Sequence, residues 1–86
     1  MTSVTVSFSG STDTTQVFVD DVLVLTGPGT VSRPVEPGEN SLSWFVRGAP
    51  GSSYEIKITD PKSAAFSHQA TVDASTKDAG IHWFLV

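Results

Sequence analysis

The stretch SLSWFVRGAPGSSYEIKI, residues 41–58, decides the fold of this chain. Apolar residues alternate with polar ones on both sides of the glycine-rich segment GAPGSS, residues 48–53. A period of two places alternate side chains on one face of an extended strand, so both flanks predict β-strands. The predicted inner face of this central hairpin consists of Leu42, Trp44, Val46, Tyr54, Ile56 and Ile58.

The glycine-rich segment itself could bind phosphate or could form a turn. A phosphate-binding loop of the GxxxxGK[ST] type needs a lysine and a following helix whose N-terminus faces the phosphates. Here Gly48 and Gly51 precede two serines and an alternating strand, with no lysine and no helical pattern. Glycine supplies positive φ and proline a preset φ, and both suit turns. The segment is therefore predicted to be the turn of a hairpin.

The same alternation recurs along the chain in short segments separated by breaks rich in glycine and proline. The predicted strands are residues 3–9, 15–20, 22–26, 30–35, 41–47, 53–59, 66–73 and 80–86, with a short turn near 61–65. Pro34 cannot donate a ladder hydrogen bond, so its strand is predicted to lie at a sheet edge. This spacing predicts an all-β fold, a single antiparallel β-sandwich of about seven or eight short strands over residues 1–86.

Composition and charge exclude several classes of protein. The chain has 86 residues, no cysteine and a net charge of −4. Its length suits one domain, and the lack of cysteine rules out disulfides and cysteine-ligated zinc. The lysines and arginines are scattered, whereas a nucleic-acid-binding face needs clustered cations. No apolar run approaches the roughly 20 residues of a membrane span. No nucleic acid partner and no membrane span are expected.

The first ten residues, MTSVTVSFSG, contain no basic segment followed by a continuous apolar run, so no signal peptide is visible. This leaves two compartments open. The protein is cytoplasmic, or it is extracellular if a signal sequence has been removed.

Residues 41–61, SLSWFVRGAPGSSYEIKITDP, resemble the strand, loop and strand of bacterial immunoglobulin-like and fibronectin type III-like β-sandwiches. In those folds an apolar tryptophan-containing strand precedes an alternating strand led by tyrosine. The resemblance implies an immunoglobulin-like sandwich. The chain lacks the paired cysteines of antibody domains, and Trp44 lies in mid-chain and not near the first third, where the fibronectin pattern has it. Because such sandwiches host many functions, the resemblance assigns no activity.

No constellation of residues predicts catalysis or a bound cofactor. The chain has no GxSxG elbow and no cysteine nucleophile. His68 shares a face of its strand with Phe66 and Ala70, and His82 shares a face with Phe84 and Val86, so each is interpreted as a half-buried, hydrogen-bonded histidine. The two imidazoles could approach if their strands pair, but two imidazoles alone do not make an active site. We therefore expect a protein that is not an enzyme.

Acidic pairs are the candidates for a metal site. Asp20 and Asp21 join two apolar runs, and Asp73 and Asp78 flank the last loop. Calcium requires six to eight oxygen ligands, which these surroundings do not supply, and no DxDxDG spacing is present. Aspartate in turns commonly hydrogen-bonds the local backbone and tolerates the left-handed region. No metal site is predicted.

Two segments are apolar on both faces. A two-residue loop at Asp20–Asp21 would give the pairs Val19–Val22, Phe18–Leu23 and Val17–Val24. The last strand divides into Ile81, Trp83 and Leu85 on one face and His82, Phe84 and Val86 on the other. Both tryptophans are expected in the core, because burial is usual for large aromatic side chains. The outward apolar residues are then expected to be Phe18, Leu23, Leu25, Phe45 and Phe84.

A contiguous exposed apolar patch usually marks an interaction surface, although a bulge or a barrel corner can also turn such side chains inward. The last strand has no charge after Gly80, so it is expected to be central in its sheet or paired across a subunit boundary. The leading hypothesis is a non-enzymatic module that associates with itself, as a homodimer or higher assembly, or with another protein. The alternative is a carbohydrate-binding module, whose candidate residues are Trp83, Trp44, Tyr54, Asn40 and Gln69.

Overall fold

The structure, a computed structural model, describes residues 2–86. These residues form eight β-strands and one short 3₁₀-helix. The elements are β1 (Thr2–Gly10), β2 (Thr14–Val19), β3 (Val22–Leu25), β4 (Gly29–Val35), β5 (Glu39–Arg47), β6 (Ser53–Asp60), η1 (Lys62–Ala64), β7 (Phe66–Thr71) and β8 (Lys77–Leu85). The predicted all-β class, the eight strands and the turn near residues 61–65 are confirmed. Met1 of the predicted domain lies outside the described residues.

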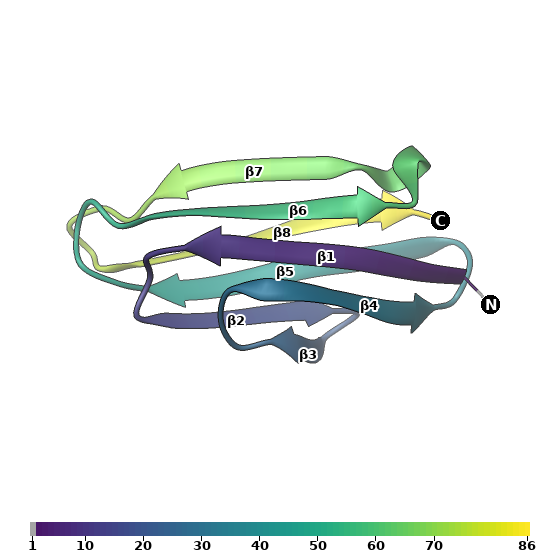
Figure 1. The fold of residues 1–86 in the computed structure, drawn as a ribbon, viewed down its shortest axis with the longest axis horizontal. Coiled ribbons are helices and arrows are strands. Elements are labelled where there is room, and N and C mark those ends of the chain that lie inside the picture. Colours follow the sequence, from purple (N-terminus) through teal and green to yellow (C-terminus); the bar gives the residue numbers. More distant parts are fainter. Residues whose placement is uncertain (1) are drawn as a thin grey trace.

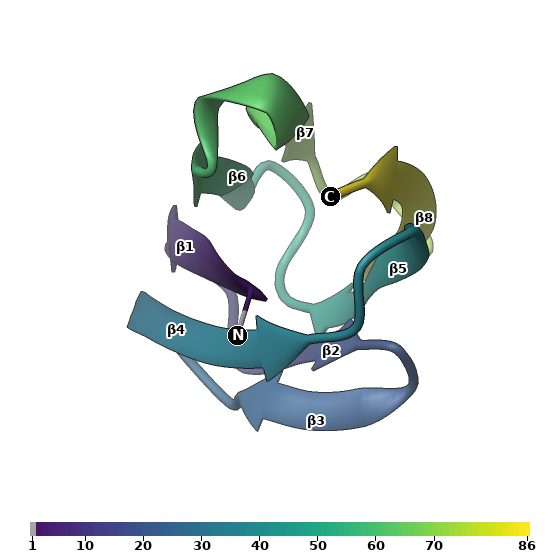
Figure 2. The same cartoon turned by 90° about the vertical axis from the view of Figure 1, so that its right-hand side faces the viewer.

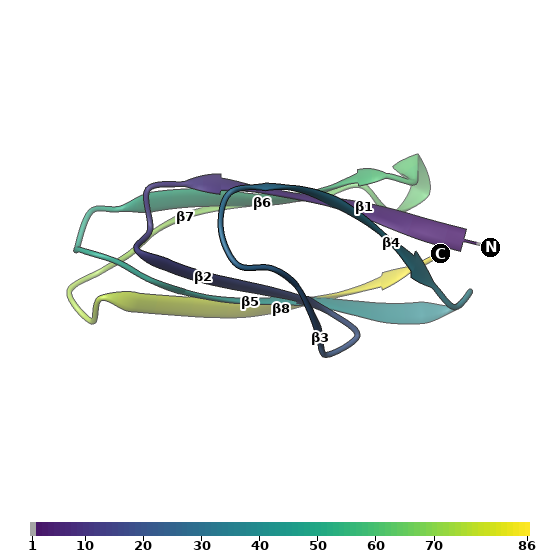
Figure 3. The same ribbon diagram turned by 60° about the horizontal axis from the view of Figure 1, so that its bottom comes forward.

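The strands form two antiparallel sheets that face each other (Figure 1). One sheet has the strand order β4-β1-β6-β7, and the other has the order β3-β2-β5-β8. Seen end on, β3 and β4 lie at one side of the molecule, and β7 and β8 lie at the other (Figure 2). The two layers run nearly parallel along the long axis of a molecule measuring 40 × 18 × 17 Å (Figure 3). As Pro34 predicted, β4 lies at an edge, where its missing N–H costs no ladder bond.

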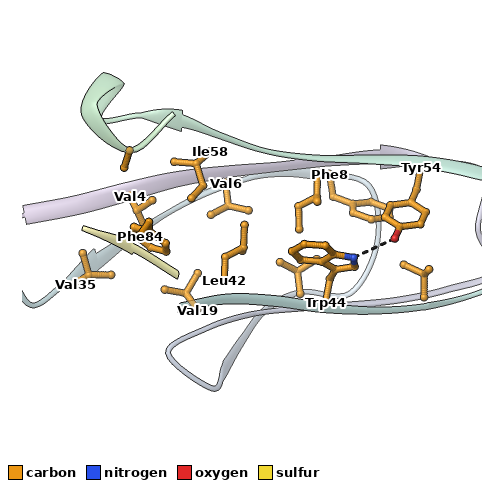
Figure 4. Close-up of a cluster of buried hydrophobic side chains, with 14 of the residues drawn as sticks. Val4, Val6, Phe8, Val19, Val35, Leu42, Trp44, Tyr54, Ile58 and Phe84 are labelled. Atoms are coloured by element: carbon orange, nitrogen blue, oxygen red, sulfur yellow. Dashed lines mark hydrogen bonds between the residues drawn. The ribbon is translucent and has the colours of Figure 1, made fainter. Parts of the chain in front are cut away.

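Alternating side chains from both sheets fill the space between the layers. All six residues predicted for the inner face are buried: Leu42, Trp44, Val46, Tyr54, Ile56 and Ile58. The predicted hairpin is nevertheless wrong, because β5 pairs with β2 and β8 while β6 pairs with β1 and β7. The two strands therefore face each other across the core instead of lying side by side. Figure 4 shows Leu42 and Trp44 on one layer pointing toward Ile58 and Tyr54 on the other.

The segment 48–53 is a turn that carries the chain from one sheet to the other. The amides of Gly48 and Gly51 donate to the carbonyls of Thr76 and Val72, at 2.9 Å each. These bonds hold the segment against the end of β7 and the loop before β8, and Gly51 adopts the positive φ of 93° that favours glycine. The segment is therefore a turn, as predicted, but it connects the two sheets and does not close a hairpin within one sheet.

The β2–β3 hairpin turns at Asp20 and Asp21, both with positive φ, the geometry of the two-residue turns that match strand twist. The pairs Val19–Val22 and Phe18–Leu23 are confirmed. The register of the β2–β3 pair shifts between Val17 and Phe18. This shift places Val17 opposite Leu25, so the predicted pair Val17–Val24 is wrong. The bulge also turns Leu25 toward the core, against which it packs half-buried. Its predicted outward position is therefore wrong.

Strand β8 begins at Lys77 and lies at a sheet edge, which excludes the central position and leaves pairing across a subunit boundary as the other predicted alternative. It pairs with β5 over nine residues without a bulge. This register sets Gly80 opposite Trp44, and it therefore turns the even-numbered side chains of β8 inward. Phe84 is only 5 % exposed and belongs to the core, whereas Trp83 points outward. The predicted faces of this strand are thus reversed.

Candidate interaction surface

The outer face of the β3-β2-β5-β8 sheet carries a group of apolar side chains that the core does not bury. Ile81, Trp83 and Leu85 on β8 are 56 %, 59 % and 68 % exposed, and Leu23 on β3 is 45 % exposed. Phe18 and Phe45 are half-buried on the strands between them. We call these six residues the apolar patch: Phe18, Leu23, Phe45, Ile81, Trp83 and Leu85.

Strand pairing makes the patch continuous from one edge of the sheet to the other. Leu23 is opposite Phe18, Phe18 is opposite Ser43, and Ser43 is opposite Ile81. Neighbouring strands lie about 4.8 Å apart, so the side chains of this row are in reach of one another. Complete burial of an aliphatic or aromatic side chain contributes roughly 1.5–3 kcal/mol. More than half of the surface of each patch residue on β8 remains available for that contribution.

Charged residues lie at the two ends of this face and leave its middle free. Arg47 and Lys77 are cross-strand neighbours at one end, and Glu39 is opposite Leu85 at the other. The Arg47 guanidinium lies 6.0 Å from the centre of the Phe45 ring, which places it over the patch margin. The face is therefore apolar in its centre, basic at one end and acidic at the other.

Of the five residues predicted for a binding surface, the structure brings three together. Phe18, Leu23 and Phe45 lie in the apolar patch, whereas Leu25 packs against the core and Phe84 lies inside it. The exposed residues of β8 were assigned to the wrong face of their strand. Gly80 is the residue that could have indicated the correct face of β8. The inward Trp44 on the neighbouring strand β5 needs a residue without a side chain opposite it, and Gly80 is that residue.

A hydrogen-bonded chain inside the sandwich joins the two sheets. Trp44 Nε1 donates to the Tyr54 hydroxyl at 3.0 Å, and that hydroxyl donates to Asp78 Oδ2 at 2.6 Å (Figure 4 shows the first bond). Burial, reinforced by the bond to Asp78, raises the pKa of Tyr54 to about 12. Asp78 thus serves as an internal acceptor, which sequence patterning did not reveal because its partners are distant in the chain.

The two histidines lie at the open side of the sandwich, in a cleft of about 400 Å³ between β7 and β8. These strands are edges of opposite sheets and do not pair. The His82 ring stacks on Phe66 with 3.8 Å between centroids, and the His68 ring lies 5.2 Å from that of Trp44. Both imidazoles are half-buried as predicted. Aromatic contacts surround them, in place of the expected hydrogen bonds.

The acidic candidates serve turn geometry. Asp20 Oδ1 accepts the Ser41 amide at 2.9 Å, and Asp73 Oδ1 accepts both the amide and the hydroxyl of Ser75. The bonds from Ser75 lower the pKa of Asp73. Within residues 2–86, no three His, Asp or Glu side chains gather closely enough to hold a metal ion.

The residues considered for sugar binding are dispersed over the molecule. Trp44, Tyr54 and Asn40 are buried, and Gln69 lies on the other sheet, where it donates to Glu55. The tryptophan of β8 is the exposed aromatic member of the set. It borders a hollow of about 490 Å³ between η1 and β8, whose other lining residues include Glu39, Ser63 and His82.

Comparison of the chain with protein-family models, with curated proteins and with solved structures gives no match in any of the three. In the part of the chain that the structure describes, no helix has the length and apolar character needed to cross a membrane. The features of this molecule that bear on function are therefore its apolar patch, the charges at the ends of that face and the hollow beside Trp83.

Proposed function

We propose that this protein is a non-enzymatic interaction module that binds a protein surface, its own or another, through the apolar patch. The observation that carries this proposal is the row of exposed side chains on β8, Ile81, Trp83 and Leu85. A soluble domain with a buried core of its own does not need these residues for folding. Contiguous exposed apolar surface of this kind marks interaction sites in soluble proteins, and large aromatic residues are enriched there.

The edge position of β8 supports the same proposal. One side of the strand pairs with β5, and its other edge offers backbone groups to a further chain. Bare edges recruit other strands unless charge, proline or a bulge protects them. From Ala79 to Leu85 the strand has no formally charged residue, no proline and no register shift.

We also propose that the sandwich is immunoglobulin-like, as the resemblance of residues 41–61 implies. In immunoglobulin-like domains one sheet contains strands C′, C, F and G in that order, and E lies beside B in the other. The order β3-β2-β5-β8, with β4 beside β1, agrees with this arrangement. The chain departs from it in two respects. Strands β6 and β7 intervene between β5 and β8 in sequence, and Trp44 lies on β5, in the place of strand F, whereas the tryptophan of immunoglobulin domains lies on strand C.

Hydroxyl-radical footprinting tests whether anything covers the patch. The protein is oxidised as a dilute pure sample, as a concentrated pure sample and in a lysate of its source cells. We expect Trp83 to react in the dilute sample and to be protected in at least one of the others. The buried Tyr54 reports that the fold is intact in all three. Equal oxidation of Trp83 in every sample would refute the proposal.

A carbohydrate-binding module is the second candidate, favoured by one observation. Trp83 offers an exposed ring beside a hollow that also contains Glu39 and Ser63, a stacking platform next to oxygen groups that hydrogen-bond hydroxyls. Retention on insoluble cellulose, chitin or starch tests it. Binding that Trp83→Ala abolishes and Leu23→Lys leaves unchanged would support this function, because Leu23 lies on the opposite edge of the sheet. No retention on any of these polysaccharides would count against it.

A further inference from the structure

The outer face of the β3-β2-β5-β8 sheet has a direction, set by the charges at its ends. Arg47 and Lys77 form the basic end. Glu39, together with the turn residues Asp20 and Asp21, forms the acidic end. Eight residues of β5 separate the positions of Arg47 and Glu39, which is about 27 Å at about 3.4 Å per residue. That distance is about three times the screening length of roughly 8 Å at physiological ionic strength, so the charges at the two ends do not neutralise each other.

These end charges have no ion-pair partner among residues 2–86. Among residues 2–86 the one ion pair joins Lys57 to Glu55 on the other sheet. Asp13 lies beside the basic end, where its amide donates to the Arg47 carbonyl, yet its carboxylate makes no ion pair with Arg47. Both ends of the face are therefore available to a partner that presents the opposite order of charge.

A second copy of the chain presents that order in one orientation. Two identical faces can stack about a two-fold axis that lies between them, either along the strands or across them. An axis along the strands gathers the basic ends of both copies at one end of the interface. An axis across the strands, through the row of Ser43 and Ile81, sets the basic end of each copy over the acidic end of the other. In that arrangement Glu39 of one copy lies over Arg47 of the second.

Side-chain size is complementary in the same orientation. The axis exchanges positions that lie equally far on either side of the row of Ser43 and Ile81. Trp83 therefore lies over Ala79 of the second copy, and Phe45 lies over Ser41 of the second copy. Trp83 and Phe45 thus each meet a small residue, which suits two stacked sheets about 10 Å apart, whereas Phe18 lies in the central row and meets Phe18 of the second copy. Building on the proposed function, we infer that the apolar patch docks a second copy of this chain in antiparallel orientation, with its charged ends paired.

The size of the face sets the strength expected of this dimer. On this face β5 and β8 have nine residues each, about 27 Å between their end residues, whereas β2 and β3 have six and four. Four strands about 4.8 Å apart therefore cover less than roughly 400 Å² of flat sheet. Stable interfaces bury about 800 Å² of accessible surface on each partner. The complex is therefore expected to be a reversible dimer, visible as a rise in mass between roughly 1 µM and 1 mM.

Sedimentation equilibrium across that range tests the association and the face it uses. Ile81→Lys, at an exposed position beside the axis, should weaken the dimer by roughly tenfold or more. The matched control Ser9→Lys, at an exposed position on the outer face of the other sheet, should leave it unchanged. Circular dichroism and thermal melting of each variant show that both remain folded.

Charge reversal tests the orientation. Arg47→Glu alone and Glu39→Arg alone each replace attraction by repulsion at both ends of the dimer, and each should weaken it roughly tenfold at low salt. An equimolar mixture of the two variants restores opposite charges across the interface and should form a heterodimer of wild-type strength. High salt should reduce all of these differences.

The outcomes separate this inference from the proposed function. A wild-type mass that stays monomeric overturns the inference, while protection of Trp83 in the lysate would still uphold binding to another protein. A dimer that Ile81→Lys weakens, but that the mixed charge variants fail to restore, overturns the antiparallel orientation alone. A dimer that Ile81→Lys leaves unchanged removes both this inference and the self-association part of the proposed function.

Discussion

Replacing Gly80 by alanine should destabilise the protein through a single contact. Gly80 is opposite Trp44 in the β5–β8 ladder, and the indole ring occupies the space that a Cβ at position 80 would fill. A Cβ at position 80 would come within 2.7 Å of Trp44 Cε2, far inside van der Waals contact, so the ring would have to move. Overpacking of this kind costs about 1–3 kcal/mol. Displacing the indole also weakens its bond to Tyr54, at about 0.5–1.5 kcal/mol. Alanine regains about 0.5–1 kcal/mol of glycine's entropic cost, leaving a net loss of about 0.5–4 kcal/mol.

Urea denaturation of the wild type and Gly80→Ala measures this loss directly. Gly27→Ala is the matched control, because a Cβ at position 27 meets nothing within 4 Å, and it should raise the free energy of unfolding by no more than about 0.5–1 kcal/mol. In a Trp44→Leu background, which removes the ring, Gly80→Ala should cost clearly less than in the wild type. This difference isolates the contact as a coupling energy. A Gly80→Ala protein as stable as the wild type would show that the indole does not occupy the space above Gly80.

Three further predictions concern the interior. The pKa of Tyr54 is raised from its ordinary value of 10.0 to about 12 in the folded protein, so the unfolded chain loses this proton first. The free energy of unfolding should therefore fall between pH 10 and 12. Urea titrations at pH 8 and 11.5 should show a smaller fall for Tyr54→Phe, and equal falls would contradict this. Trp44→Ala should lose about 3–5 kcal/mol, so an unchanged melting temperature would argue against its burial. Phe84→Glu should unfold the protein, and Leu23→Glu should leave a native circular dichroism spectrum. A folded Phe84→Glu would contradict its inward orientation.

The alternation of apolar and polar residues predicts the strands well, because it reports which side chains share a face of one strand. It does not report which strand lies beside which. Residues 41–47 and 53–59 were therefore predicted correctly as strands with one buried face each, yet wrongly as a hairpin. A turn between two sheets and a turn within one sheet use the same glycine and proline chemistry. The sequence of residues 48–53 does not distinguish them.

Where both faces of a strand are apolar, the pattern also leaves open which face points inward. In β8 the preference of tryptophan for burial predicted an inward Trp83, but pairing with β5 placed Gly80 under Trp44 and turned Phe84 inward instead. A single extra residue in the β2–β3 ladder likewise reversed Leu25. An apolar outer surface was thus predictable from the two-sided strands, and Phe18, Leu23 and Phe45 were predictable members. The contribution of β8 depended on a register that only the folded chain reveals.

The passage of the chain between the two layers at residues 48–53 has a consequence for how the protein reaches its native state. Each sheet combines strands from both halves of the chain: β1 pairs with β6 in one, and β5 pairs with β8 in the other. The β2–β3 and β6–β7 pairs join neighbouring segments, whereas closing the larger loops loses chain entropy before the distant contacts form. Folds dominated by such distant pairings take milliseconds to seconds to form. Because completing each layer needs strands from both halves of the chain, we expect the whole sandwich to cross the barrier to folding in one cooperative step.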